Sequence, residues 1–301
     1  MNMTGIILSL VLAPLYIGII NQTKAFFAGR RGSGFLRPYW TIAKLLGKSH
    51  PKSATTNWIF AAAPSVTVAS TVAAALVFPF AGNGNSFFGG LSAVLFFYLL
   101  AAGRFFTVLA AYDTGSAFED MGGAREATFS GLIEGAIFAI LGFLSLASGE
   151  TGIASVLGDF GSGDWLHHSI SIVMALAAMF AILLAETCRV PFDDPETHLE
   201  LTMIHEAMIL DNSGPDLAFI HYGAALKFEL LAGFLAAMAL PSMGGIHPLA
   251  RLALFFGAIA AIALLTGIIE STMAKMRFIK TPQTIFAIFI ASTLAAVLFI
   301  L

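Results

Sequence analysis

Eight long apolar stretches run through the chain, and they constrain its fold more than any other feature. A helix needs about 20 largely apolar residues to cross a bilayer. Eight stretches reach that length, at residues 4–23, 58–80, 88–111, 127–148, 168–186, 223–241, 250–269 and 282–301. Only 11% of the residues are charged, against about 25% in soluble domains. The sequence therefore predicts an all-α integral membrane bundle of eight transmembrane helices, with residues 1–301 as a single polytopic membrane domain.

The basic residues gather in two segments between these spans. Lys275, Arg277 and Lys280 follow the seventh stretch. A longer run follows the first stretch, comprising Lys24, Arg30, Arg31, Arg37, Lys44, Lys48 and Lys52. Loops rich in Lys and Arg lie on the cytoplasmic side of a membrane, and with eight spans residues 112–126 and 187–222 are then cytoplasmic too. We expect a multi-pass protein of the inner (cytoplasmic) membrane with both termini outside.

The composition excludes several kinds of chemistry in this chain alone. A single cysteine, Cys188, excludes an internal disulfide and any cysteine-ligated iron–sulfur cluster or zinc site built from this chain. No phosphate-binding glycine loop is present, and the run from Gly122 to Arg125 is interpreted as a turn in a short cytoplasmic loop between helices. The basic first loop lies between two spans, which favours docking of a protein partner or of lipid headgroups over nucleic acid. The docking candidates in this loop are Arg30, Arg31, Arg37, Lys44 and Lys48.

Residues 186–216 contain eight carboxylates in a chain that is otherwise almost uncharged. Asp194 and Pro195 are typical of a helix start, and the run from Asn212 to Pro215 is typical of a helix end. The helix between them has two polar sides, Glu196, Glu200 and Asp211 on one and His198 and His205 on the other. It is either a solvated surface helix or, as its apolar residues favour, a helix docked under the spans or against a partner.

His198 and His205 lie on one side of this predicted helix. They are potential metal ligands, but two histidines without a clear third ligand are a weak indication of a metal site. A structural or interface role is the favoured interpretation, and we expect no metal site in this chain.

Glu186 and Arg189 are three residues apart where the fifth span leaves the membrane, a spacing that lets them share a helix face. One interpretation is an ion pair at a helix end. The other is a proton relay, because an arginine beside a partly desolvated carboxylate sets its protonation. The two interpretations are compatible.

The fourth span has carboxylates along one face, because Glu126 and Glu134 are separated by two helical turns. An ionisable group deep in a membrane is costly and is therefore a candidate functional group. Small residues run beside them at Ala127, Gly131 and Gly135, which allows another helix to approach. Glu134 is expected to face protein rather than lipid, either in an ion path or as a buried carboxylate that holds helices together.

Further charges lie on the third and sixth spans. Lys227 and Glu229 are two residues apart and point in different directions, so each needs a partner on another helix. Arg104 lies about two turns inside the third span, where it either extends toward the cytoplasm or pairs with one of the acids. Ionisable groups on the inner half of four spans indicate a proton or ion path rather than a transporter for an apolar solute.

The acidic segment resembles a known signature. Glu186-Thr-Cys-Arg-Val-Pro-Phe-Asp193, followed by Glu196 and by Glu200-Leu201, is similar to the acidic loop of the eight-span membrane subunit shared by respiratory complex I, as its subunit 1, and the group 4 membrane-bound NiFe hydrogenases. The loops around residues 29–48 and 113–126 resemble those of the same family. The run from Glu200 to Asp211 resembles the formate hydrogenlyase (hydrogenase-4) branch most, whereas quinone-reducing complex I usually has Glu-Leu-Val-Ala-Gly-Phe there.

The resemblance implies a subunit that anchors a peripheral electron-transfer arm and links it to ion movement. Its partners would be the hydrogenase large and small subunits on the cytoplasmic side, antiporter-like membrane subunits, and lipid, with NiFe and iron–sulfur centres in the partners and no cofactor in this chain. The implied coupling set is Glu134, Glu186, Arg189, Asp193, Glu196, Glu200, Glu206, Asp211 and Glu229, to which the span charges add Lys227 and Arg104. In the second cytoplasmic loop, Arg125 and Glu126 join the docking candidates.

Two other functions stay open. One is the quinone-site subunit of an NADH:quinone oxidoreductase-like complex, which requires a lipid-open cavity near spans one, five and six. The other is a stand-alone ion-coupled transporter, which the lack of an inverted repeat and of paired broken spans disfavours. In each case this chain is a non-catalytic membrane component or a transporter, and no residue is predicted to be catalytic.

Overall fold

The structure of the chain is a computed structural model that describes residues 2–53, 55–80, 90–160, 168–193, 203–240 and 247–300. Within these ranges it has helices and no β-strand. The helices are α1 (Asn2–Phe27), α2 (Arg37–Leu46), α3 (Trp58–Val77), α4 (Ala93–Thr114), α5 (Ala117–Ser148), α6 (Ile153–Phe160), α7 (Ser169–Glu186), α8 (His205–Met208), α9 (Gly214–Ala239), α10 (Pro248–Thr272), the 3₁₀-helix η2 (Phe278–Lys280) and α11 (Thr281–Ile300). Eight described helices are long and apolar enough to cross a membrane, namely α1, α3, α4, α5, α7, α9, α10 and α11. The predicted all-α bundle of eight spans is confirmed.

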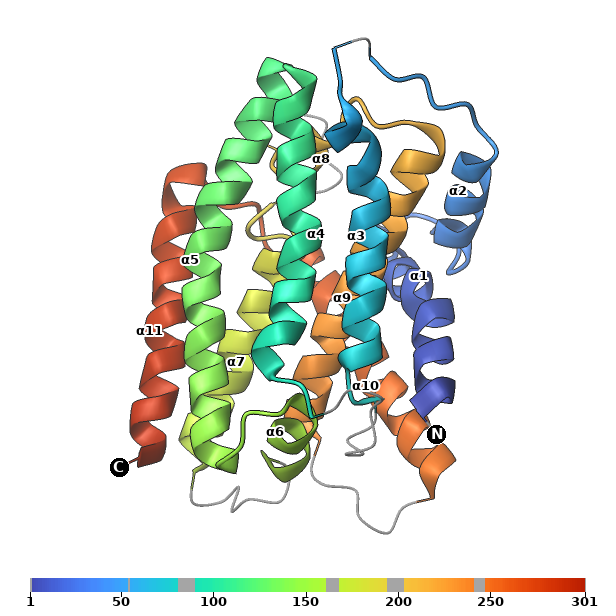
Figure 1. Ribbon diagram of the computed structural model, residues 1–301. Coiled ribbons are helices and arrows are strands. Elements are labelled where there is room, and N and C mark those ends of the chain that lie inside the picture. The colour runs from blue at the N-terminus through green and yellow to red at the C-terminus, as the bar shows by residue number, and fades with distance from the viewer. Residues whose placement is uncertain are drawn as a thin grey trace.

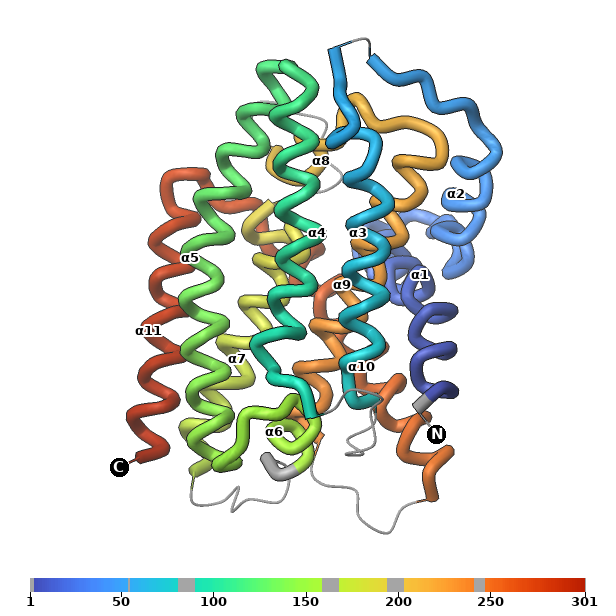
Figure 2. Tube along the Cα trace, in the orientation of Figure 1, coloured from blue at the N-terminus to red at the C-terminus, as the bar shows by residue number. Residues whose placement is uncertain are grey.

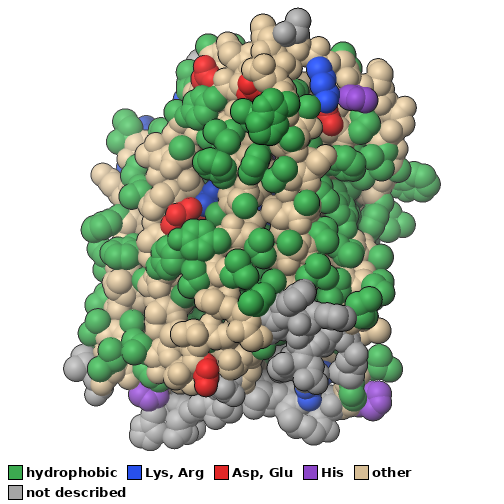
Figure 3. Space-filling model, in the orientation of Figure 1, with side chains coloured by type: hydrophobic (Ala, Val, Ile, Leu, Met, Phe, Trp, Pro, Cys, Tyr) green, Lys and Arg blue, Asp and Glu red, His purple; other side chains and the backbone are tan. Residues whose placement is uncertain are grey.

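The long helices stand side by side, with α9 inside the bundle (Figure 1). Helix α9 is buried along most of its length and contacts α1, α3, α7 and α10. The outer helices instead expose large apolar side chains, among them Phe105, Val173, Leu264 and Phe286. Figure 3 shows apolar side chains over much of one face. Such a surface is solvated by the hydrocarbon core of a bilayer, so the chain is a multi-pass membrane protein.

The two ends of the bundle differ in what they hold. Both termini lie at one end, as an even number of spans requires (Figure 1). Helices α2 and α8 lie in the half away from the termini, where α8 packs against α4 and α5 (Figure 2). The basic segment after α1 and the described part of the acidic segment are therefore in the same half of the molecule.

The connection between α4 and α5 is much shorter than predicted. We predicted a cytoplasmic loop over residues 112–126 with a turn at Gly122 to Arg125, and this prediction is wrong. Helix α4 continues to Thr114, and α5 begins at Ala117. Gly115 makes the reversal with a φ of 69°, a left-handed conformation that glycine adopts without strain. The helical Gly122 has no side chain because α8 packs there, and a Cβ atom would lie 3.0 Å from the Cβ atom of Ala207.

The acidic segment also departs from the prediction. The start of the predicted helix, residues 194–202, lies outside the described residues. From residue 203 onward the helix covers only His205–Met208, and so it does not reach Asp211 as predicted. Pro215 does not end a helix but lies in the first turn of α9, which begins at Gly214, nine residues before the predicted start of the sixth span at residue 223. Proline is favoured at that position because the first helical N–H groups have no intrahelical acceptor.

A close contact between α3 and α4 determines the depth at which Arg104 enters the bundle. Gly103 lies against Thr67 and Ser70 of α3, and a Cβ atom at Gly103 would lie 2.6 Å from the hydroxyl oxygen of Ser70. A missing side chain lets two helix backbones approach each other. Helix α3 thus packs tightly against the side of α4 that carries Gly103. The next residue, Arg104, points toward α5 and α7.

Candidate functional site

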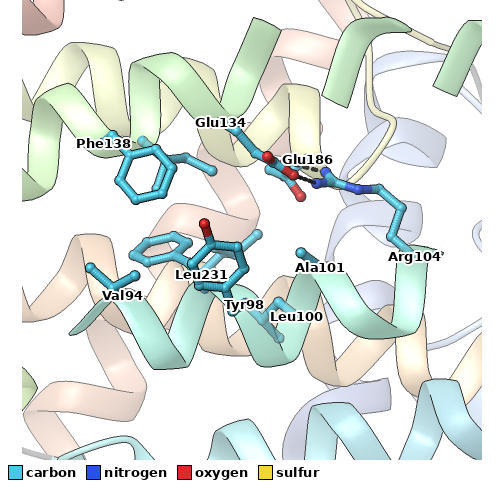
Figure 4. Close-up of a pocket in the computed structure, with 11 residues that line it drawn as sticks. Val94, Tyr98, Leu100, Ala101, Arg104, Glu134, Phe138, Glu186 and Leu231 are labelled. Atoms are coloured by element: carbon cyan, nitrogen blue, oxygen red, sulfur yellow. Dashed lines mark hydrogen bonds and ion pairs between the residues drawn. The ribbon is translucent and has the colours of Figure 1, made fainter. Parts of the chain in front are cut away.

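Arg104 is at the centre of a buried charge cluster. Its guanidinium, from α4, donates a hydrogen bond to Glu186 at the end of α7 and a second one, of 2.9 Å, to Glu134 of α5. Glu126, two turns along α5, lies 3.9 Å from the guanidinium Nε atom. Figure 4 shows the Glu134 and Glu186 carboxylates converging on Arg104. One arginine thus joins three carboxylates from two other helices.

A second cation completes the cluster from α9. The Lys227 ammonium lies 2.8 Å from the second carboxylate oxygen of Glu186. The central cluster is therefore Arg104, Lys227, Glu126, Glu134 and Glu186. Buried charges persist when they are paired and hydrogen-bonded. The cluster therefore has three carboxyl groups and two cations, one carboxyl group more than it has cations.

Exposure changes from one end of the central cluster to the other. The Glu186 side chain is 5% exposed and that of Arg104 is 9% exposed, whereas that of Glu134 is 40% exposed. The Glu134 side chain is exposed on the face made by α4 and α5, in a pocket that Tyr98 and Phe138 also line (Figure 4). Figure 3 shows an acidic and a basic side chain together within the apolar middle of that face. We predicted that Glu134 faces protein, and within this chain alone it is only half covered.

The small residues beside Glu134 differ in whether another helix packs against them. Gly135 faces α11, where a Cβ atom would lie 3.7 Å from the ring of Phe289. Gly131 has no atom of another residue within 4 Å of the same position. The close helix approach that we predicted for this stripe is therefore present at Gly135 and absent at Gly131 within the described residues.

Three neighbouring cavities that share lining residues lie between one end of the bundle and Glu134. The largest, of about 850 Å³, lies between α1, α2, α9 and α10. A second, of about 70 Å³, shares Thr187, His205 and Ala224 with it and reaches Glu126 and Lys227. A third, of about 20 Å³, shares Arg104 and Glu186 with the second and ends at Glu134. Charged and polar side chains are therefore present in each of these neighbouring cavities, from the end of the bundle away from the termini to the α4–α5 face.

The wall of the large cavity contains an ion-paired triad that we did not predict. Glu270 at the end of α10 lies 2.8 Å from Arg189 and 3.1 Å from Lys24 of α1. The guanidinium of Arg189 also lies over the ring of Phe228, 5.2 Å from its centre. The predicted pair of Arg189 with Glu186 is thus wrong, because α7 ends at Glu186 and the chain turns away. A carboxylate at residue 270, directly after an apolar span, was the signal that could have shown the triad.

Asp193 holds the described part of the acidic segment in place. Its carboxylate accepts hydrogen bonds from the backbone N–H groups of Ile204 and His205, at 3.0 and 3.2 Å. Lys275, after α10, donates to the other oxygen at 2.7 Å. A nearly fully buried carboxylate satisfied in this way fixes the position of α8 relative to the end of α10.

Two titratable groups near Asp193 are kept neutral by burial. Burial raises the pKa of the Cys188 thiol well above its usual value, and the nearby carboxylates of Glu126 and Asp193 add to this effect. The thiol donates a weak hydrogen bond to Glu126, at 3.7 Å. Burial also lowers the pKa of His205, against the opposing effect of Glu206. A neutral thiol and a neutral imidazole therefore lie where the second cavity meets the central cluster.

Glu229 lies apart from the central cluster although it is two residues from Lys227. It is fully buried on α9 and faces Ser9 of α1. No described cation forms an ion pair with it, and neither carboxylate oxygen has a hydrogen-bond partner within the described part of the chain. The prediction that Lys227 and Glu229 point in different directions is confirmed.

The remaining predicted residues that the structure describes lie in the half of the bundle away from the termini. Glu206 lines the large cavity, as do Arg30, Arg31 and Arg37. Lys44 and Lys48 are exposed in and after α2. The backbone N–H of Asp211 donates to the buried Glu119, a residue that we did not predict, at 2.9 Å. Arg125 donates to the carbonyl of Met203 at 3.0 Å and lies over the ring of Phe278. Glu196, Glu200 and His198 lie outside the described residues.

Among the described residues, no three His, Cys, Asp or Glu side chains form a group that could hold a metal ion. The site is instead a set of paired charges that links helices from both halves of the chain. Paired charges of this kind, with one carboxyl group more than cations, are able to bind a proton or a monovalent cation.

Several known proteins are similar to this chain. A family model described as NADH dehydrogenase matches residues 1–301. Hydrogenase-4 component C of Escherichia coli (strain K12) is 31% identical over 279 residues, which cover 91% of this chain and 87% of that protein. Formate hydrogenlyase subunit 4 of the same organism is 30% identical over 288 residues, covering 91% and 90%. A chain of the membrane-bound sulfane sulfur reductase (MBS), an archaeal respiratory membrane complex, has the same fold, with a TM-score of 0.85, 17% identity and coverage of 98% and 97%.

Proposed function

This chain belongs to the NADH dehydrogenase family, and we propose that it is the membrane anchor and ion-coupling subunit of a complex I-like membrane-bound hydrogenase of the formate hydrogenlyase type. The family predicted from the acidic segment is thus confirmed. Its sequence relatives named for hydrogenase-4 and formate hydrogenlyase support the hydrogenase branch. In this proposal the chain carries out no bond chemistry and links electron transfer in a peripheral arm to proton or sodium translocation.

The central cluster is the observation that carries the proposal. It has one carboxylate more than it has cations, so it can take up one proton or one monovalent cation and become electrically balanced. Arg104 contacts both Glu186, in the interior, and Glu134, at the α4–α5 face. In this proposal a change in the charge of Glu186 therefore acts on Glu134 through Arg104. Uptake at the inner side and release at Glu134 would then move charge across the bundle.

The link to electron transfer runs through the acidic segment. Asp193 holds α8, and His205 of α8 lines the two larger cavities. A partner that moves this segment changes the surroundings of Glu126 and Lys227, which line the second cavity together with His205. In this proposal a redox change in the peripheral arm acts on the central cluster by this route.

We assign partners by the faces that they would cover. Hydrogenase large and small subunits, with the NiFe and iron–sulfur centres, would cover the inner end that holds α8, since this chain has a single cysteine. Antiporter-like membrane subunits would cover the α4–α5 face where Glu134 opens. The inner end would be cytoplasmic, with both termini on the outer side of the inner membrane.

The test is purification of the native complex in mild detergent through a tag on this chain. Nickel in the complex, with hydrogen evolution from a reduced electron donor, is the expected result. A nickel-free complex that evolves no hydrogen would contradict the proposal.

The large cavity favours a second candidate, the quinone-site subunit of an NADH:quinone oxidoreductase-like complex. Its volume of about 850 Å³ lies within the range of small-molecule sites, about 300–1,000 Å³. The same purification separates the two candidates. A nickel-free complex that reduces quinone, with inhibition by a quinone-site inhibitor, would support this second function.

A further inference from the structure

We propose that the large cavity at the inner mouth binds an anionic phospholipid, with its headgroup phosphate held by Arg30, Arg31 and Arg37. Nothing in the ion-coupling role requires this site. The inference depends on three observations, which are the charge of the cavity wall, the position of α2, and the construction of the loop that carries the arginines.

The wall of the cavity is strongly basic. Five cations line it, and only two carboxylates do so, those of Glu206 and Glu270. Glu270 already pairs with Lys24 and Arg189. Arg30, Arg31 and Arg37 form no ion pair with any residue in the described part of the chain. Guanidinium groups bind phosphate oxygens through paired, charge-assisted hydrogen bonds, so a phosphodiester matches this unpaired charge.

The three arginines lie beside a helix that is suited to a membrane surface. Helix α2 has polar and apolar sides and buries none of its residues. Trp40 is 73% exposed, and Leu36 and Phe35 are exposed beside it. Tryptophan and arginine are the residues that anchor helices at the level of lipid headgroups. The mouth of the cavity is therefore at the depth where a headgroup phosphate lies.

The loop between α1 and α2 is held against α1 rather than left free. The side-chain oxygen of Gln22 accepts a hydrogen bond from the backbone N–H of Gly34, at 3.3 Å. Gly34 has a φ of 87°, and a Cβ atom at Gly32 would lie 2.0 Å from the same Gln22 oxygen. The arginines thus project from a positioned loop, which reduces the entropy lost when a ligand orders them.

The interior of the cavity is suited to acyl chains. Its apolar lining includes Pro14, Ile17, Ile42, Ala225 and Phe228. An amphiphile that carries a phosphate pairs with the arginines and also covers the apolar lining. Inorganic phosphate would leave the apolar lining in contact with water, and a neutral quinone would leave the three arginines unpaired. A phospholipid with a net negative headgroup is therefore the occupant that matches the whole cavity.

The experiment measures binding of a short-chain fluorescent phosphatidylglycerol to the delipidated native complex, with phosphatidylcholine and inorganic phosphate as competitors. The test variant is the triple substitution Arg30→Gln, Arg31→Gln and Arg37→Gln. The matched control removes three cations from the same side of the membrane that do not line the cavity, Lys44→Gln, Lys48→Gln and Lys52→Gln. The arginine variant is expected to bind about a hundredfold more weakly, and the lysine variant within about threefold of wild type.

Several results would overturn the inference. Equal losses in both variants would indicate diffuse surface attraction, and equal binding of phosphatidylcholine would remove the role of charge. Displacement by inorganic phosphate as strong as that by phosphatidylglycerol would indicate a soluble anion site. Binding only after the peripheral subunits are stripped would assign the cavity to a protein partner. If the arginine variant does not assemble, a photoreactive phosphatidylglycerol on the wild-type complex must label residues 14–42, and labelling elsewhere would contradict the site.

Discussion

The central cluster and the cavity mouth contain similar numbers of charged residues but balance them differently. In the cluster, every carboxylate lies beside Arg104 or Lys227, and both cations are held by carboxylates. At the mouth, Arg30, Arg31 and Arg37 have no partner among the described residues, although they line the same cavity as the paired Arg189. Depth accounts for the difference. Charges in a low-dielectric interior are stabilised mainly by partners within the protein, whereas those at the interface are solvated by water and headgroups.

The largest effect is expected when the deep cluster loses its shared cation. Arg104→Gln leaves three carboxylates with Lys227 alone, and breaking a buried ion pair in this way costs about 3–5 kcal/mol. We expect little assembled complex in the membrane, measured by the yield of intact complex through a tag on a partner subunit. The matched variant Arg104→Lys keeps the charge and should restore most of the yield. Normal yield from Arg104→Gln would show that the cluster does not hold the helices together.

The triad at the wall of the mouth should tolerate the loss of its carboxylate better. Glu270→Gln leaves Lys24 and Arg189 facing each other, but both can turn toward the cavity. We expect a loss of about 1–3 kcal/mol, the usual cost of unpaired buried polar groups, seen as a lower melting temperature of the detergent-solubilised complex. As a control, Lys24→Gln leaves the Arg189–Glu270 pair and should lower the melting temperature less. The reverse order would contradict the assigned pairing.

His205 provides a smaller, pH-dependent effect at the junction of the two regions. Burial lowers its pKa below the ordinary value of 6.5, with Lys227 and His221 adding to burial and Glu206 and Asp193 opposing it. The released segment therefore binds a proton that the docked segment does not, and docking weakens as the pH falls below about 6.5. Intrinsic amide exchange slows as the pH falls, so the quantity to measure is the protection factor, the ratio of the intrinsic to the observed rate. For residues 203–210 this factor should fall between about pH 7.5 and about pH 5.5.

The control for this prediction is His205→Gln, in which the pH-dependent loss of protection should disappear. The same loss of protection in the variant would show that the proton is not on His205 and would contradict the prediction.

The sequence allowed correct prediction of the fold because an apolar stretch of about 20 residues specifies a span without reference to its neighbours. It also showed Arg104, Glu134, Glu186 and Lys227 as ionisable groups in an apolar setting. The partners were not predictable, because Arg189 has its carboxylate 81 residues away, on α10. The three-residue spacing suggested Glu186 as the partner of Arg189, on the assumption of a continuous helix. Helix α7 ends at Glu186, so the two side chains do not share a helix face. The α4–α5 reversal was missed because Gly122 and Gly123 look like a turn, but they allow close packing in a helix.

The most direct test of the ion-coupling role uses Glu134, where substitution should affect stability least because the side chain is 40% exposed. Glu134→Gln in the complete complex is placed in liposomes, and electron transfer and ion movement across the membrane are measured together. We predict an assembled complex that still transfers electrons but moves fewer ions per electron or turns over more slowly. An assembled variant with unchanged turnover and an unchanged ratio of ions to electrons would contradict the role of Glu134 in coupling and show that it only packs helices.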